Sequence, residues 1–192
     1  MHHASHAKVI SGIFLAATLI GAAPAHASGF TLSSPDIKAG STIAKRFEFN
    51  GFGCSGENKS PALKWSGAPK DAKSFAVTVY DPDAPTGSGW WHWMVINIPA
   101  SVTELAAGAG APNSTALPAG AVQSRIDYGV NGWGGVCPPQ GDKPHRYIFT
   151  VHALKVDKLD VPADATAALT GFMINGNSLG KASFTAKYGR AK

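Results

Sequence analysis

Glycine and proline divide this chain into short segments, and this punctuation limits the folds that it can adopt. The 192 residues include 22 glycines and 13 prolines. The segments between them are rich in β-branched and aromatic residues, which is typical of short β-strands bounded by turns. The strongest strand candidates are residues 74–80, 92–98 and 145–154, and weaker ones are 30–32, 47–49, 63–65 and 183–188.

Helical signals appear only near the C-terminus. Asp164 is a candidate N-cap for a helix over residues 165–174. Asn177 or Ser178 could cap a further short turn. Residues 106–120 are rich in glycine, alanine and proline and are expected to form a surface loop. We therefore predict one mainly β, sandwich-like domain with a small helical portion at its C-terminal end.

The N-terminal segment has the pattern of an export signal. Lys8 precedes an apolar run over residues 9–23, and Ala25-His26-Ala27 supplies the small-x-small pattern of a cleavage site. The run is shorter than the about 20 residues that a helix needs to span a bilayer. We predict a signal peptide over 1–27 and a mature domain over 28–192, placed in the periplasm or secreted. An uncleaved N-terminal anchor is the alternative.

The distribution of charge argues against a nucleic-acid partner. The chain has a formal net charge of +5, and its lysines and arginines are scattered. Nucleic-acid interfaces show a basic stripe with interleaved aromatic residues, and the sequence lacks one. The excess positive charge favours small anionic ligands, or peripheral contact with an anionic membrane surface.

Cys54 and Cys137 are the two cysteines of the chain, and both follow the predicted cleavage site. An even count in an exported protein favours a disulfide. The bond would close a loop of about 84 residues and stabilise the fold by roughly 4–5 kcal/mol in the chain-entropy model. Two free buried thiols or a catalytic thiolate are the alternatives.

Candidate functional residues concentrate at the ends of the three strongest strand segments. Asp81 and Asp83 follow the first segment, and His92 begins the next after a loop with two prolines and two glycines. These strands are expected to pair antiparallel, which places Asp81 and His92 at one end of the sheet. His145 begins the third segment and reaches the same end if that strand runs parallel to residues 92–98.

Alternation along the third segment separates its side chains onto two faces. His145 and Tyr147 share one face, whereas Arg146 points to the other. Strand ends on a rigid scaffold are common places for binding groups, so Tyr147 could line one cavity with His145. Structural interpretations compete with this one. The Asp-Pro pair at Asp81 is typical of a turn, and His152 among apolar neighbours is expected to pack in the core.

Three longer motifs stand out along the chain. They are Asn58-Lys59-Ser60-Pro61-Ala62-Leu63-Lys64-Trp65, Asp81-Pro82-Asp83-Ala84-Pro85 followed by His92-Trp93, and Gly141-Asp142-Lys143-Pro144-His145-Arg146-Tyr147. Their order and spacing resemble the phosphatidylethanolamine-binding protein family, in its bacterial Raf-kinase-inhibitor-like branch. The likeness runs from about Phe30 to Arg190.

The resemblance implies a fold and a site. The fold is a β-sandwich of a larger and a smaller sheet with short helices. The site is a small pocket that binds phosphate, phosphorylated head groups or similar anions, without a cofactor and without catalysis. Carried over by motif, the pocket residues are Asp81, Asp83, Pro85, His92, His145 and Tyr147. The resemblance also implies a cis peptide bond between Ala84 and Pro85, with Arg146 supporting the loop from outside.

Several other functions compete with anion binding. Residues 176–180 match the nucleophile-elbow string G-x-S-x-G, but no Asp, Glu or His follows Ser178, as that fold requires. Asp81, His92 and His145 could instead form a two-histidine, one-carboxylate metal site or serve a phosphoester hydrolase. A protease inhibitor or protein-interaction module could use the loops 82–91 and 106–120, and a homodimer is also open.

Overall fold

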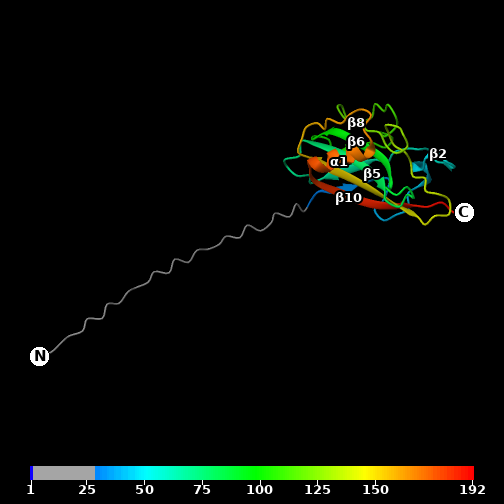
Figure 1. The fold of residues 1–192 in the computed structure, drawn as a ribbon, viewed down its shortest axis with the longest axis horizontal. Coiled ribbons are helices and arrows are strands. Elements are labelled where there is room, and N and C mark those ends of the chain that lie inside the picture. Colours follow the sequence, from blue (N-terminus) through cyan, green and yellow to red (C-terminus); the bar gives the residue numbers. More distant parts are fainter. Residues whose placement is uncertain (2–28) are drawn as a thin grey trace.

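The computed structural model describes Met1 and residues 29–192, so the predicted signal peptide lies, but for Met1, outside the described part of the chain. Within that part the chain is mainly β, with one α-helix (Figure 1). In chain order the elements are β1 (Thr31–Ser33), the short 3-10 helix η1 (Lys45–Phe47), β2 (Asn50–Gly51), β3 (Cys54–Ser55), β4 (Leu63–Ser66), β5 (Ser74–Asp81), β6 (Trp90–Pro99), β7 (Glu104–Leu105), β8 (Val122–Gln123), β9 (His145–Leu154), α1 (Ala167–Asn177) and β10 (Ser178–Tyr188).

The large sheet places the ends of three strands at one edge. Its strand order is β10-β9-β5-β6-β8, and every neighbouring pair is antiparallel. Since β6 and β9 both pair with β5, they run parallel to each other, as the strand-end argument required. The end of β5 at Asp81 therefore lies at the same edge as the start of β6 at Trp90 and of β9 at His145.

A sandwich core fills the space between the large sheet and the smaller sheet, which has the order β1-β4-β7. Trp65 of β4 meets Phe75 of β5 with ring centroids 5.5 Å apart. Leu32, Leu63 and Val95 belong to the same buried cluster. This arrangement confirms the predicted β-sandwich of a larger and a smaller sheet.

The helix α1 covers the opposite face of the large sheet (Figure 1). Ala167 and Ile174 of α1 form a second buried cluster with Ala76, Met94 and Leu154. The central strand β5 is thus buried on both faces, and seven of its eight residues are buried. The sequence of such a strand is a nearly continuous apolar run rather than an alternating pattern.

Three local predictions are wrong in detail. Residues 47–49 form no strand, because η1 turns there and anchors the buried Phe47 in the core. The helix begins at Ala167, with Thr166 as its N-cap in place of Asp164: the Thr166 hydroxyl accepts a hydrogen bond from the Leu169 amide at 3.2 Å. Only one helix forms in the C-terminal part, because Ser178 starts β10 rather than a further turn.

Cys54 and Cys137 form a disulfide, as predicted, with their Cα atoms 6.1 Å apart. The bond ties the hairpin β2–β3 to the loop before β9. Residues 106–120 contain no helix or strand, in keeping with the predicted loop. Among the residues that the structure describes, no helix is long and apolar enough to cross a membrane.

Candidate functional site

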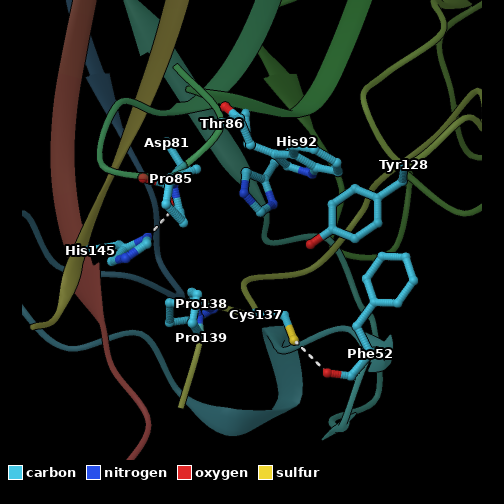
Figure 2. A pocket seen from close by; sticks show the side chains of 12 residues that line it. Phe52, Asp81, Pro85, Thr86, His92, Tyr128, Cys137, Pro138, Pro139 and His145 are labelled. Atoms are coloured by element: carbon cyan, nitrogen blue, oxygen red, sulfur yellow. Dashed lines mark hydrogen bonds and ion pairs between the residues drawn. The ribbon is translucent and has the colours of Figure 1, made fainter. Parts of the chain in front are cut away.

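A cavity of about 170 Å³ opens at the edge where β5 ends and β6 and β9 begin (Figure 2). Its polar floor comes from these three strands, and its walls come from the loops around them. It is lined by Phe52, Asp81, Ala84, Pro85, Thr86, Trp90, His92, Tyr128, Cys137, Pro138, Pro139 and His145. Four of the six predicted site residues therefore line one cavity: Asp81, Pro85, His92 and His145.

Asp81 and His145 form a buried pair at the cavity floor. Nδ1 of His145 donates to Oδ2 of Asp81 at 2.8 Å. The other carboxylate oxygen of Asp81 accepts the backbone N–H of Asp83 at 2.8 Å, which starts the loop after β5. Asp81 therefore both starts the turn after β5 and lines the cavity. On its far side, Nε2 of His145 lies 3.5 Å from Oδ2 of the half-exposed Asp142.

His92 is a neutral hydrogen-bond acceptor toward the cavity. Its Nδ1 lies 2.7 Å from the carbonyl oxygen of Gly134. A carbonyl oxygen can only accept, so Nδ1 carries the proton. Burial lowers the pKa of His92 to about 4, against the opposing effects of the Gly134 carbonyl and the Asp81 charge. At neutral pH the ring is therefore uncharged, and its Nε2 presents a lone pair.

Asn58 positions the backbone that holds His92. The Asn58 side-chain oxygen accepts the N–H of Gly135 at 2.7 Å, and its amide donates to the carbonyl of Trp133 at 3.3 Å. The carbonyl of the intervening Gly134 accepts the hydrogen bond from Nδ1 of His92, and the Gly134 N–H donates to the His92 carbonyl at 2.8 Å. The motif that begins at Asn58 thus acts on the site through the loop 133–135, a role that sequence reasoning did not assign.

The cavity walls are mostly aromatic rings and prolines. Tyr128 lies between the floor and the rim, because its ring meets His92 at a centroid distance of 5.5 Å and Phe52 at 5.9 Å. Its hydroxyl donates to the carbonyl of Gly135 at 2.8 Å, and burial raises the pKa of Tyr128. Pro138 and Pro139 close the side opposite Pro85 (Figure 2).

Asp83 and Tyr147, two further predicted site residues, do not line this cavity. Asp83 lies outside it and is bound by Arg146 through its backbone N–H at 2.8 Å and its guanidinium at 2.7 Å. The Arg146 hydrogen bonds lower the pKa of Asp83 to about 2. The exposed position of Arg146 agrees with the expected supporting role.

Tyr147 shares the face of His145, as alternation predicted, but it lies two residues further along β9. That step places it inside the core: the side chain is completely buried, and its hydroxyl has no partner among the described residues. Its ring packs edge-on against His92 at 5.0 Å. Tyr147 therefore supports the floor from below.

The expected cis bond before Pro85 is absent. Residues 29–192 contain no cis peptide bond, so Ala84–Pro85 is trans. The Asp81 turn and the bond from the Thr86 hydroxyl to the Gly89 carbonyl, at 2.6 Å, shape the loop instead. Pro85 still reaches the cavity in this conformation.

The remaining lining residues were not predicted. Ala84, Thr86 and Trp90 lie within or close to the motif around Asp81 and His92 and could have been included on proximity alone. Phe52 and Tyr128 carry no such signal. In residues 29–192, no group of three His, Cys, Asp or Glu side chains is arranged to hold a metal ion.

Comparison with known proteins adds a family match to this geometry. The family model described as phosphatidylethanolamine-binding protein matches residues 33–189. The Escherichia coli K12 protein YbcL is 55% identical over 164 residues, which cover 85% of this chain and 90% of that protein. YbhB of the same organism is 48% identical over 157 residues, covering 82% and 98%.

Solved structures agree with the sequence comparison. The crystal structure of Escherichia coli YbcL matches with a TM-score of 0.83 at 54% identity, covering 84% of this chain and 99% of that one. A phosphatidylethanolamine-binding protein homologue from Chlamydia trachomatis, CT736, matches with a TM-score of 0.69 at 31% identity, covering 84% and 98%. Sequence and fold thus point to the same family.

Proposed function

The chain belongs to the phosphatidylethanolamine-binding protein family, and from that premise we propose that it is an exported, non-catalytic protein that binds small anions. Its ligands would be phosphate or phosphorylated head groups, held in the cavity at the strand ends. One observation carries the proposal. Asp81, His92 and His145 arrive from three strands at the floor of one small cavity with apolar walls, which is the usual design of a specific small-ligand site.

The hydrogen-bonding state of His92 limits the range of ligands that suit the cavity. Since its Nε2 is an acceptor, a suitable ligand must bring a hydrogen atom to it. A phosphate monoester has a second pKa of about 6, so near neutral pH a fraction of it carries both an O–H donor and acceptor oxygens. The ammonium group of an ethanolamine could meet the same nitrogen. Head groups of this kind fit the floor better than a fully ionised anion.

Positive charge beside the cavity favours anions further. His145 also lines a neighbouring cleft, together with Lys143, Arg146 and Lys187. Of the carboxylates there, Asp83 is already paired with Arg146. The remaining excess of cations would raise the local concentration of anionic ligands.

The hydroxyl and sulfur groups that line the cavity are engaged elsewhere, which favours a binding role. The Thr86 hydroxyl donates to the Gly89 carbonyl, and the Tyr128 hydroxyl donates to the Gly135 carbonyl. Cys137 is held in the disulfide. Thr86, Tyr128 and Cys137 are therefore not available for covalent catalysis, which needs a nucleophile within reach of a base.

Three observations support export to the periplasm. Disulfides persist in oxidising compartments such as the periplasm, and Cys54 is bonded to Cys137. A Mycobacterium tuberculosis protein named "Putative lipoprotein LppC" is 37% identical over 144 residues. Lipoproteins are exported, and the N-terminal sequence of this chain has the features of an export signal.

Nuclear magnetic resonance titration tests the binding. Isotope-labelled protein, purified after export, is titrated with inorganic phosphate and with phosphoethanolamine while backbone and imidazole signals are followed. We expect both ligands to shift signals of Asp81, His92 and His145 in a saturable manner.

The variant His92→Asn keeps an N–H for the Gly134 carbonyl and removes Nε2, so it should lose the response. His152→Gln is the matched control, since His152 is another buried histidine, bonded to Thr78 away from the cavity. No shift in the unmodified protein at millimolar ligand would overturn the proposal, as would an unchanged response in His92→Asn.

A further inference from the structure

The hairpin β2–β3 presents an aromatic residue in an unusual backbone conformation. Gly51 pairs with Cys54, so the hairpin loop consists of Phe52 and Gly53. Their φ angles are 52° and 77°, the positive values of the turn that normally takes Asn-Gly or Gly-Gly. A bulky residue with positive φ is strained, and such positions cluster at functional sites.

Phe52 is also exposed where an apolar side chain gains little from the fold. Its side chain is 74% exposed, although it lies at the rim of the cavity. Its ring stacks over Tyr128 with an interplanar angle of 13°, and Tyr128 in turn meets His92. Aromatic surface therefore runs from the polar floor to solvent along one wall (Figure 2).

Two links hold Phe52 in this place. The disulfide joins Cys54, at the start of β3, to Cys137, whose Sγ lies 3.8 Å from the Phe52 carbonyl oxygen. The guanidinium of Arg190 donates to the carbonyl of Gly53 in the hairpin and, at 3.2 Å, to that of Pro138 in the facing loop. A two-residue hairpin would be weakly ordered alone, so these links keep Phe52 at the cavity mouth.

The cavity is too small for an extended ligand. Its volume of about 170 Å³ is below the roughly 300–1,000 Å³ of sites that enclose drug-sized molecules. A head group that occupies the floor must send any substituent out through the mouth, along the wall that ends at Phe52.

We propose that Phe52 is a specificity-determining residue, which selects ligands that carry a flat apolar or aromatic group next to the anionic head. The disulfide and Arg190 position it for this contact. The inference rests on the proposed function, because it assigns the part of the ligand that leaves the same cavity. Offset stacking of the ligand group on the Phe52 ring would supply the preference.

Isothermal titration calorimetry with two ligands distinguishes the contribution of the anionic head to the affinity from that of its substituent. Inorganic phosphate reports the floor alone, and phenyl phosphate adds one aromatic ring. We expect the unmodified protein to bind phenyl phosphate about threefold to tenfold more tightly than phosphate. Phe52→Ala should abolish this preference, so that phenyl phosphate and phosphate bind the variant equally tightly, and alanine keeps the β-carbon and the positive φ of the turn.

Phe172→Ala is the matched control. Phe172 on α1 is 72% exposed, which is close to the exposure of Phe52, but it does not line the cavity. This variant should retain the affinities of the unmodified protein for both probes. A double variant, Cys54→Ala with Cys137→Ala, should lower the preference for phenyl phosphate if it stays folded by circular dichroism, because the hairpin is then less firmly held.

The outcomes separate the two proposals. Equal affinity for both probes, or a preference that survives in Phe52→Ala, overturns the role of Phe52 and leaves anion binding intact. Binding of neither probe by the unmodified protein overturns the proposed function and the role of Phe52 with it.

Discussion

Nδ1 of His145 lies 2.8 Å from Oδ2 of Asp81, and both side chains are almost completely buried. A buried carboxylate is tolerated only where hydrogen bonds or an opposite charge compensate for lost solvation. Here one oxygen of Asp81 accepts from the imidazole and the other from the Asp83 amide. The pair therefore connects the loop after β5 to the start of β9 and defines the cavity floor.

Asp81→Asn should weaken both the fold and the site. One oxygen becomes an NH₂ group, which then faces the N–H of His145 or of Asp83, so a buried donor loses its acceptor. We expect the free energy of unfolding, measured in urea, to fall by about 1–3 kcal/mol, and phosphate affinity to drop at least tenfold. Asp71→Asn, at an exposed carboxylate before β5, should change neither. Unchanged stability in Asp81→Asn would contradict the buried pair.

Asp142→Asn should strengthen anion binding. The substitution removes a negative charge 3.5 Å from Nε2 of His145, and with it the repulsion of a phosphate bound beside this histidine. Two unit charges about 4 Å apart in water interact by about 1 kcal/mol, so phosphate affinity should rise by about fivefold in calorimetry. A gain is informative because general damage to the fold would have the opposite sign. A loss of affinity would place the anion away from this side of His145.

The buried neutral histidines should make the fold sensitive to mild acid. Burial lowers the pKa of His92 and of His152 to about 4, whereas both titrate near 6.5 in an unfolded chain. Between pH 6.5 and 4 the unfolded state binds protons that the folded state does not. The stability is therefore complete above pH 6.5 and declines as the pH falls to 4, by about 3 kcal/mol for each histidine.

Urea unfolding at several pH values between 7.5 and 4 measures this decline. His92→Asn and His152→Gln should each reduce the slope in that window by up to about 1.4 kcal/mol per pH unit, the value for one proton. A slope that neither substitution changes would show that other groups take up the protons.

The ion pair outside the cavity makes a separate prediction. Hydrogen bonds from Arg146 hold the pKa of Asp83 at about 2, so the contribution of this pair to stability is present above pH 4 and is lost as the pH falls through 2. Arg146→Gln should raise the pKa of Asp83 toward its ordinary value, followed by carboxyl signals in nuclear magnetic resonance. Arg46→Gln, which disrupts a pair with Asp36, should leave the pKa of Asp83 unchanged.

Removal of the disulfide should cost stability, because the bond spans a sequence separation of 83 residues. Cys54→Ala with Cys137→Ala should lower the free energy of unfolding by about 4 kcal/mol in urea. Alkylation without reductant, followed by mass spectrometry, should add no group to the unmodified protein and two groups after reduction. Two alkylated cysteines before reduction would contradict the bond.

Much of the fold could be predicted because its strongest signals are local. The segments that form β5, β6 and β9 combine apolar or β-branched side chains with flanking turn residues. A window of about ten residues is therefore enough to recognise each of them as a strand. The strand predicted over residues 47–49 is wrong, since a run of three residues cannot distinguish a strand from the turn of η1. The N-cap is Thr166 rather than Asp164, because both residue types are competent N-caps and the sequence does not distinguish them.

Of the cavity, the floor and Pro85 could be predicted. Asp81, His92 and His145 stand at strand ends, so the sheet register that the sequence implied brings them together. Tyr147 was placed on the correct face, but alternation does not report depth, and two residues along β9 separate the cavity from the core. Asp83 lies outside the cavity because it pairs with Arg146 of the neighbouring strand β9.

The amino-acid sequence alone was enough to predict the three main strands, the end of the sheet at which they meet, the cysteine pair and the residues of the cavity floor, because each depends on a short-range pattern or on a count. Most of the cavity walls depend on the tertiary structure. Phe52, Tyr128 and Pro138 belong to three separate loops, and their meeting depends on the packing of the whole sandwich and on the disulfide. The neutral state of His92 also depends on the tertiary structure, since the pKa of a histidine follows from its burial and its partners, which no local sequence pattern records.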